Sequence, residues 1–128
     1  MEIEVGEYVR TKKGIIAKLE CINGGSDYIF DKSIYRKYSD TIEILQEYEL
    51  EKYIAKHSFD IIDLIEVGDL VQIHDRGNRI YQVDRNYQGK LAIIDVGWNE
   101  YETLYNENIK NIVTKEQFES MEYKVGEE

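Results

Sequence analysis

A short apolar-Gly-acid motif occurs three times in the chain and constrains how it can be divided. Residues 5–9 read Val-Gly-Glu-Tyr-Val, and residues 67–71 read Val-Gly-Asp-Leu-Val, 62 positions later. A truncated third copy, Val-Gly-Glu, occupies residues 125–127, 58 positions after the second. The glycine can adopt backbone conformations closed to other residues, and the valines favour a strand. The recurrence predicts two units of about 60 residues that open in the same way.

A second pair of similar segments supports this duplication. Residues 54–60 read Ile-Ala-Lys-His-Ser-Phe-Asp and align with residues 113–119, Val-Thr-Lys-Glu-Gln-Phe-Glu, at a constant offset of 59. Thr114 and Gln117 have the spacing of a capping box, in which each side chain accepts a hydrogen bond from the backbone N–H of the other residue. We therefore expect a short capped helix at residues 115–120.

These markers predict a first unit at residues 1–66 and a second at residues 67–128, with a chance match of short motifs as the alternative. Units of this size are marginally stable alone, so we expect them to pack against each other. If the duplication is real, Val9 should superpose on Val71 and Phe59 on Phe118.

The junction between the predicted units is a short capped turn. Ser58 is a plausible N-cap, and Asp60 would lie in the first turn, where its charge suits the helix dipole. Gly68 then ends the turn before the second motif continues as a strand. The side chains expected to be buried here are Phe59, Ile61, Ile62, Leu64 and Ile65.

The composition predicts a mainly β fold. The sequence has eighteen Ile and eight Val but only three Ala. Branched side chains suit pleated sheets, whereas scarce alanine argues against a helical bundle. There is no proline, and no Gly/Ser-rich spacer separates the two units. A linker of either kind is therefore not expected.

Turn residues divide each unit into hairpins. Residues 12–14 and 23–27 are glycine-containing turns in the first unit, and residues 75–78 and 85–89 take these places in the second. Residues 31–53 fit no clear pattern and form an irregular insertion, with residues 47–51 as a turn. The strands expected are residues 3–11, 15–22, 28–30, 41–45 and 53–55, followed by 70–74, 79–83, 91–95, 101–104, 109–113 and 121–125.

The Gly-acid-x-Val opening and the hairpin spacing resemble SH3-like barrels, including the KOW type. That resemblance implies two tandem SH3-like units, and KOW-like units imply nucleic-acid binding. In addition, residues 112–119 and residues 61–69 resemble small proteins of Firmicute phages and prophages. This second resemblance implies a phage-encoded accessory protein and supplies no active-site residues.

The chain is acidic, with a formal net charge of −10 at pH 7. Residues 1–66 carry nine Lys/Arg and fourteen Asp/Glu, and residues 67–128 carry seven and twelve, so each half contributes −5. Such a surface repels phosphate backbones, which makes direct nucleic-acid binding unlikely. The charge fits either an ordinary cytoplasmic protein or an acidic surface that docks on a basic partner.

Catalytic and metal-binding patterns are absent from the sequence. Cys21 is the one cysteine and lies in an apolar strand, so a structural thiol in a reducing compartment is expected. His57 and His74 show no metal-ligand or catalytic spacing. No apolar stretch approaches the length of a membrane span. We therefore expect a cytoplasmic protein that is not an enzyme, with no cofactor and no bound metal.

One group of residues stands out against the acidic background. Three arginines lie within ten positions, close to aromatic residues that can stack on a base or on a guanidinium group. The group predicts a pocket for a small anionic nucleotide; alternatively, the arginines pair with Asp69, Asp75 and Asp84. The predicted ligand-binding residues are Arg76, Arg79, Arg85, Tyr81, Tyr87 and Trp98.

A second candidate surface lies in and beside the irregular insertion, where glutamates alternate with tyrosines. Tyrosine is enriched at protein interfaces because it combines a large apolar ring with a polar hydroxyl. Tyr28 is a further candidate for this exposed group. The predicted partner-binding residues are Glu43, Glu47, Glu49, Glu51, Tyr35, Tyr38 and Tyr48.

Three functions remain open from the sequence. The first is an inhibitor of a host defence protein, similar in action to anti-CRISPR proteins, whose acidic surface binds a basic groove. The second is a sponge that sequesters a nucleotide signal, and the third is a KOW-like nucleic-acid binder. A homo-oligomer is compatible with each of them.

Overall fold

The computed structural model describes residues 1–31, 44–94 and 101–119, and it divides the chain into two compact units. Unit 1 comprises residues 1–64 and unit 2 comprises residues 65–128. The predicted boundary lay two residues further along the chain. Each unit contains a five-stranded antiparallel sheet, so the prediction of a mainly β protein is confirmed.

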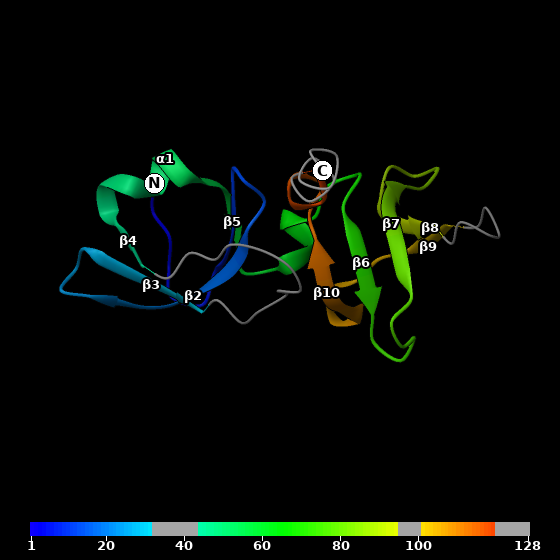
Figure 1. Cartoon of the computed structure of the whole chain (residues 1–128), viewed down its shortest axis with the longest axis horizontal. Helices are drawn as coiled ribbons and strands as arrows, with labels where there is room; N and C mark the ends of the chain where they lie inside the picture. Colours follow the sequence, from blue (N-terminus) through cyan, green and yellow to red (C-terminus); the bar gives the residue numbers. More distant parts are fainter. Residues whose placement is uncertain (32–43, 95–100, 120–128) are drawn as a thin grey trace, which may run out of the picture. The chain divides into compact units, whose positions relative to one another are not determined.

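The sheet of unit 1 has the strand order β4-β3-β2-β1-β5 (Figure 1, blue to green). Short turns connect β1, β2 and β3 as consecutive hairpins, while β5 returns to pair with β1. No ladder joins β4 to β5, so the sheet is open among the described residues. The strands are β1 (Tyr8–Thr11), β2 (Ile16–Asn23), β3 (Asp27–Asp31), β4 (Ile44–Gln46) and β5 (Ile54–Ser58).

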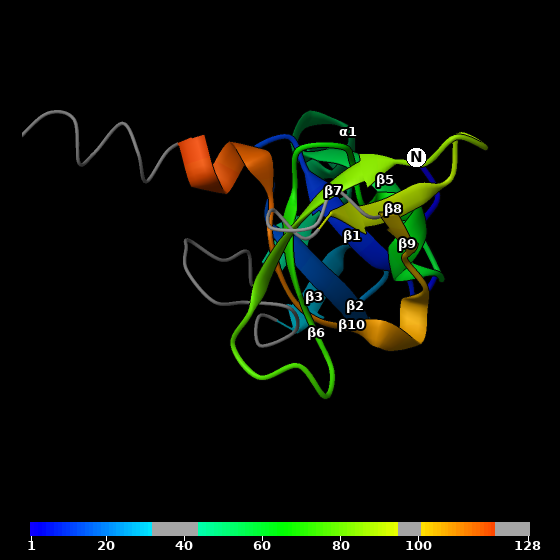
Figure 2. The same ribbon diagram turned by 90° about the vertical axis from the view of Figure 1, so that its right-hand side faces the viewer.

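The sheet of unit 2 repeats this topology with the order β9-β8-β7-β6-β10 (Figure 1, green to orange). Figure 2 shows β7, β8 and β9 of this unit side by side. Val9 pairs with Ala17 in unit 1, and Val71 pairs with Tyr81 in unit 2, so the predicted equivalence of the two valines holds. The strands are β6 (Leu70–Ile73), β7 (Ile80–Arg85), β8 (Leu91–Ile94), β9 (Tyr101–Thr103) and β10 (Ile109–Val113).

Short helices connect the last strands of each unit. A 3-10 turn precedes the final strand in both: η1 (Glu47–Glu49) in unit 1 and η3 (Asn106–Asn108) in unit 2. Unit 1 then has an additional helical turn, α1 (Leu50–Tyr53), before β5, whereas η3 leads directly into β10. After the final strand, unit 1 forms η2 (Ile61–Leu64) and residues 115–119 of unit 2 are helical.

The four residues of α1 shift the alignment of the two units. The offset is 59 at η1 and η3, but it becomes 55 at the final strands, where Ile54 pairs with Thr11 and Ile109 pairs with Ile73. The predicted equivalence of residues 54–60 with residues 113–119 is therefore wrong. Phe59 follows β5, whereas Phe118 lies inside the terminal helix, so these two residues are not equivalent.

The apolar-Gly-acid motif forms the same turn in both units. Gly6 and Gly68 have an identical φ of +98°, a conformation that L side chains rarely adopt. The N–H of Gly6 donates to the Leu19 carbonyl at 2.9 Å, and the N–H of Gly68 donates to the Val83 carbonyl at 3.0 Å. This turn therefore joins the opening of each unit to its second strand.

The acid of the motif closes the turn by accepting a hydrogen bond from the residue three positions earlier. The Glu4 N–H donates to Glu7 Oε2 at 2.6 Å, and the Glu66 N–H donates to Asp69 Oδ2 at 2.7 Å. Both acids are buried, with exposed fractions of 8% and 0%. A buried carboxylate is stable only when its oxygens are hydrogen-bonded, and these bonds meet that requirement.

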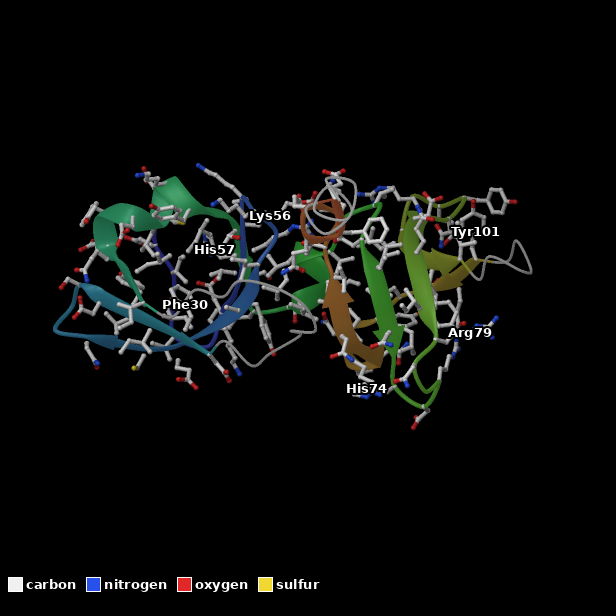
Figure 3. The ribbon with its side chains drawn as sticks, viewed as in Figure 1. Phe30, Lys56, His57, His74, Arg79 and Tyr101 are labelled. Atoms are coloured by element: carbon white, nitrogen blue, oxygen red, sulfur yellow. The ribbon has the colours of Figure 1, made fainter. Side chains whose placement is uncertain are left out.

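The second oxygen of each acid has a different partner. In unit 1 the His57 Nδ1 lies 2.9 Å from Glu7 Oε1, and Figure 3 labels His57 on β5. In unit 2 the Lys115 N–H donates to Asp69 Oδ1 at 2.9 Å, which places the carboxylate at the start of the terminal helix. Position 57 corresponds by register to Ile112, whose side chain is apolar and cannot provide a donor.

The predicted capping box of Thr114 and Gln117 is confirmed, whereas Ser58 ends β5 and is not the N-cap of η2, which begins at Ile61. The Thr114 N–H donates to Gln117 Oε1 at 3.1 Å, and the Gln117 N–H donates to Thr114 Oγ1 at 3.4 Å. Ser58 accepts a hydrogen bond from the Asp60 N–H at 3.1 Å and donates to Asp63 Oδ2 at 2.6 Å. The predicted last strand, residues 121–125, lies outside the described residues.

The burial predicted for the junction is partly correct. Ile61, Leu64 and Ile65 are buried, but Phe59 is 54% exposed and Ile62 is only half-buried. The Phe59 ring covers Gly6, because a Cβ at Gly6 would lie 3.4 Å from it. Phe59 therefore shields the turn from outside instead of filling the core.

Each unit has its own apolar core, formed by the inward face of its sheet. Equivalent positions are buried in both, such as Val9 and Val71 or Leu45 and Leu104. The core of unit 1 contains Ile3, Val9, Ala17, Leu19, Tyr28, Phe30, Leu45, Leu50 and Ile54. The buried apolar residues of unit 2 are Ile65, Val71, Ile73, Tyr81, Val83, Ala92, Ile93, Leu104, Ile109 and Ile112.

Within the described parts of the chain, none of the helices has the length and apolar character needed to cross a membrane.

Replacing Asp69 by Asn should destabilise unit 2. The amide keeps one acceptor oxygen, so one of the two buried N–H donors loses its charged partner, at a cost of about 1.5–3 kcal/mol. Native-state hydrogen exchange of the Val83 amide, which donates to the Asp69 carbonyl, measures this cost in unit 2. Glu107→Gln, at an exposed position, is the control. An equal effect of both substitutions would contradict the role of Asp69.

The Glu7 carboxylate should make unit 1 sensitive to acid. Burial alone raises its pKa, but the hydrogen bond from the Glu4 N–H and the hydrogen bond and charge of His57 outweigh burial, so the pKa of Glu7 is lowered. Its stabilising contribution is present above the ordinary glutamate pKa of about 4.3 and is lost as the pH falls through the lower folded value. Denaturation of Glu7→Gln should show a shallower acid dependence than the wild type, whereas exposed Glu20→Gln should not.

Candidate functional site

Arg76 lies in the β6–β7 connection and reaches across unit 2 to β9. Its Nη2 donates to Glu102 Oε1 at 2.5 Å, and its Nη1 donates to the Tyr81 hydroxyl at 3.5 Å. Glu102 pairs with Ile93, which is buried, and therefore projects on the inward face of the sheet. The ion pair thus connects the β6–β7 loop to the edge strand β9.

Tyr81 is the centre of the arginine group. Its ring is 4% exposed, and the guanidinium carbons of Arg76 and Arg79 each lie 5.6 Å from the ring centroid. Guanidinium groups at this distance are attracted by the electron-rich face of the ring. The equivalent residue of unit 1 is Ala17, so this arrangement belongs to unit 2 alone.

The alternative prediction was that the arginines pair with Asp69, Asp75 and Asp84. Arg76 does pair with a carboxylate, but with that of Glu102. Its partner is Glu102, whereas Asp69 is held by backbone N–H groups and Asp84 accepts from the Arg85 N–H at 2.8 Å. The hydrogen bonds to Glu102 and Tyr81 raise the pKa of Arg76, and the hydrogen bond from Arg76 lowers the pKa of Glu102.

Arg85 and Tyr87, which were also predicted to bind the ligand, lie away from the group around Tyr81. Arg79 precedes the six-residue strand β7 and Arg85 ends it, so about 20 Å of extended chain separates them. Arg85 Nη1 donates to the Gly89 carbonyl at 2.8 Å within its own hairpin. Tyr87 is 98% exposed and packs edge-on against Tyr101, with ring centroids 5.9 Å apart.

Figure 3 labels three residues of unit 2. His74 and Arg79 lie nearer the β6–β7 turn, and Tyr101 lies nearer the β7–β8 hairpin. Trp98 is outside the described residues. The structure therefore brings together Arg76, Arg79 and Tyr81 and separates them from Arg85 and Tyr87.

The predicted partner-binding surface is centred on η1 and α1. Tyr48 is 82% exposed, and Glu47 beside it is exposed. Glu51 is also exposed, and its Oε1 lies 3.0 Å from the amino group of Met1. We call residues 47–51 the acidic tyrosine turn. Glu43, Tyr35 and Tyr38 lie outside the described residues.

Local interactions hold this turn in place. The Glu49 Oε1 accepts a hydrogen bond from the Gln46 N–H at 3.0 Å, which completes a capping box at the start of η1. Leu50 is 1% exposed and anchors the turn in the core of unit 1. Glu49 therefore acts as a capping residue, while Glu47 and Tyr48 face solvent. Tyr28 is wrong as an exposed candidate because it is 9% exposed and belongs to the core.

The other chemically reactive residues have structural surroundings. Cys21 lies in β2 as a half-buried free thiol. His57 faces Glu7, and His74 is exposed. Across residues 1–31, 44–94 and 101–119, no group of three or more His, Cys, Asp or Glu side chains is arranged to hold a metal ion.

Comparison of the chain with protein-family models, with curated proteins and with solved structures finds no match. The function must therefore be argued from the arrangement of the residues themselves.

Sequence reasoning missed several residues that organise these sites. Glu102 was not associated with Arg76 because 26 positions separate them. Tyr101 was not paired with Tyr87, although the predicted hairpins could have indicated that β8 and β9 run side by side. Arg10 was also missed: it is 1% exposed and donates from Nη1 to the Leu64 carbonyl at 2.9 Å. Nothing in the sequence around Arg10 indicates that this charged residue of a strand is buried.

The Arg76–Glu102 ion pair can be tested by titration. Carbonyl carbon NMR should show that the pKa of Glu102 lies below the ordinary glutamate value of about 4.3. Arg76→Ala should return this pKa toward the ordinary value, because it removes the hydrogen bond and the positive charge. Arg79→Ala is the control and should leave the Glu102 titration unchanged. An identical Glu102 pKa in wild type and Arg76→Ala would contradict the pair.

Proposed function

We propose that the chain is a non-enzymatic binding protein that docks on a basic surface of another protein through the acidic tyrosine turn. The observation that carries this proposal is Tyr48, which is 82% exposed between glutamates on a turn anchored by Leu50. Tyrosine at the centre of a contact contributes strongly to affinity, and flanking carboxylates select a cationic partner. The net charge of −10 adds long-range attraction to such a partner.

The comparison of the two units supports this choice of surface. The equivalent turn of unit 2, η3, carries Asn106, Glu107 and Asn108 in place of Glu47, Tyr48 and Glu49. Unit 2 also lacks a counterpart of α1, which contributes Glu51. The acidic tyrosine turn is therefore specific to unit 1, as expected of a surface that acquired a separate role after duplication.

The resemblance to Firmicute phage proteins suggests the kind of partner. We propose a host defence protein whose basic groove normally holds nucleic acid, so that the acidic chain occupies the groove in the manner of an anti-CRISPR protein. The chain would then act in the host cytoplasm. Direct nucleic-acid binding, the third function considered, is disfavoured by the negative charge of both halves.

We also propose that the two units are SH3-like. Their five-stranded order, with the last strand beside the first and a 3-10 turn before it, supports this assignment. The KOW subtype has no further support from the described residues.

A second candidate function is sequestration of a small anionic nucleotide at Arg76, Arg79 and Tyr81. The packing of two guanidinium groups over one ring favours it, since both can donate to a phosphate. The Arg76–Glu102 ion pair opposes it, because a ligand must displace a bound carboxylate. We therefore rank this function second.

A matched pair of variants tests the proposed docking surface. Glu47→Lys with Tyr48→Ser changes the acidic tyrosine turn, and Glu107→Lys with Tyr105→Ser makes the same exchanges at the turn of unit 2. Host proteins captured by the wild type are identified by mass spectrometry and measured by surface plasmon resonance. The unit 1 variant should lose about thirtyfold in affinity, equivalent to about 2 kcal/mol at a central tyrosine.

The outcome of the unit 2 variant separates local docking from general charge. Equal losses in both variants would show that only net charge matters and would contradict a site at Tyr48. A DNA oligonucleotide should compete for the captured protein, since both ligands need the basic groove. Activity that is lost in Arg76→Ala and Arg79→Ala but kept in the Glu47→Lys, Tyr48→Ser variant would favour sequestration of a nucleotide as the function.

A further inference from the structure

The turn between β2 and β3 contains the one Asn-Gly sequence of the chain, Asn23-Gly24. Asparagine is a labile residue, because the backbone nitrogen of the next residue can attack the carbon of its side-chain amide. A side chain on that next residue hinders the approach, and glycine has none. The other six asparagines precede Arg79, Tyr87, Glu100, Glu107, Ile109 and Ile112. Asn23 is therefore the asparagine at which this attack meets the least steric hindrance.

The structure leaves both reacting groups accessible. Asn23 ends β2, and both it and Gly24 are exposed at the tip of the β2–β3 hairpin (Figure 1, light blue). Among the described residues, neither the Asn23 side-chain amide nor the Gly24 N–H takes part in a hydrogen bond. Apart from the adjacent residues, no atom lies within 4 Å of the place that a Cβ on Gly24 would occupy. Nothing in the surroundings therefore prevents the Gly24 nitrogen from approaching the Asn23 side chain.

The equivalent connection of unit 2, between β7 and β8, is an internal reference. Its asparagine, Asn86, is followed by Tyr87, whose side chain hinders the approach of the backbone nitrogen. The Asn86 Oδ1 also accepts hydrogen bonds from the Gln88 N–H at 2.9 Å and the Lys90 N–H at 3.1 Å. These bonds fix the amide group in place. The same reaction is therefore disfavoured at Asn86.

The reaction at Asn23 has two steps. In the first, the Gly24 nitrogen forms a bond to the Asn23 Cγ and the bond from Cγ to the amide nitrogen breaks. The amide group leaves as ammonia and takes up the proton that the Gly24 nitrogen has lost, and a cyclic succinimide remains. In the second step, one water molecule adds to a carbonyl carbon of the succinimide and opens the ring. Addition at the Asn23 backbone carbonyl gives isoaspartate, and addition at Cγ gives aspartate.

This turn holds the start of the acidic tyrosine turn. The Ser26 carbonyl accepts a hydrogen bond from the Glu47 N–H at 3.0 Å, and Asp27 Oδ1 accepts one from Gln46 Nε2 at 2.5 Å. The Ser26 N–H in turn donates to the Asn23 carbonyl at 3.3 Å, which closes the β2–β3 turn. Isoaspartate adds one carbon to the main chain and converts that carbonyl into a free carboxylate. The Ser26 carbonyl is then no longer fixed opposite Glu47.

We propose that Asn23 is a site of spontaneous deamidation, and that isoaspartate at this position releases the start of the acidic tyrosine turn. The product also gains one negative charge beside an already acidic surface. The order of this turn then depends on the age of the chain and on pH, because the attacking nitrogen must lose its proton. The proposal concerns the structure of the turn and does not depend on the turn docking on a partner.

Incubation of the full chain at mildly alkaline pH tests the site. Mass spectrometry of the peptide of residues 19–32, with enzymatic methylation to label isoaspartate, should locate the product at Asn23. Asn23→Gln should react about tenfold more slowly, because its longer side chain has one more bond to fix before ring closure. Asn23→Asp should give isoaspartate through the same succinimide, with loss of water in place of ammonia. An unchanged Asn23 after incubation, or equal modification of Asn86, would overturn the proposal.

Hydrogen exchange tests the effect on the acidic tyrosine turn. The isoaspartyl chain carries an extra negative charge and can be purified by anion exchange. In this form the Glu47 amide should exchange about tenfold faster than in the fresh chain, because its acceptor is displaced. The Leu19 amide, which donates to the Glu7 carbonyl at 2.9 Å, is the control and should not change. Unchanged exchange at Glu47 would contradict the release of the turn. Equal acceleration at Leu19 would show unfolding of unit 1 and would contradict a local effect.

Discussion

The rest of each unit depends on one interaction, a buried carboxylate that accepts a hydrogen bond from the N–H three residues before it. Glu7 makes this bond in unit 1, and Asp69 makes it in unit 2. The glycine before the acid turns the chain with a φ of +98°, and its N–H bonds to the second strand. The first strand is thereby fixed in register with the second, and the core positions follow from that register. The two units differ where the second carboxylate oxygen finds its donor, because a histidine side chain serves unit 1 and a helix N-terminus serves unit 2.

The sequence predicted the parts of the fold that depend on local patterns. The glycine and the acid recur visibly, alternating apolar residues predicted the hairpins, and Thr114 with Gln117 predicted a helix start. The alignment of residues 54–60 with 113–119 was wrong because α1 inserts four residues before β5, and short helical turns have no clear signature. Phe59 was expected in the core because it is aromatic, yet it covers a glycine that leaves space above the turn. The Arg76–Glu102 pair joins residues that are 26 positions apart in the sequence, and no local pattern predicts such a contact.

The two units share a topology and differ in their surfaces. Unit 1 has the acidic tyrosine turn, whereas unit 2 has the tyrosine-centred arginine group. Since the buried turn and core positions carry the fold, the outward positions can differ between the two units. This division accounts for a chain in which fold is repeated and binding chemistry is not. It also explains why the sequence alone gave little information about the arginine group, since its ion pair joins residues that are 26 positions apart in the sequence.

The central claim, that both units are built on the same glycine-acid turn, is tested most directly by amide hydrogen exchange measured with NMR. The relevant amides are Gly6 and Leu19 in unit 1, and Gly68 and Val83 in unit 2, which form the paired bonds between the turn and the second strand. If the account is correct, all four should exchange slowly, through unfolding of their own unit and not through local fraying. Slow exchange of one pair together with exchange of the other pair at the rate of an unfolded chain would contradict it.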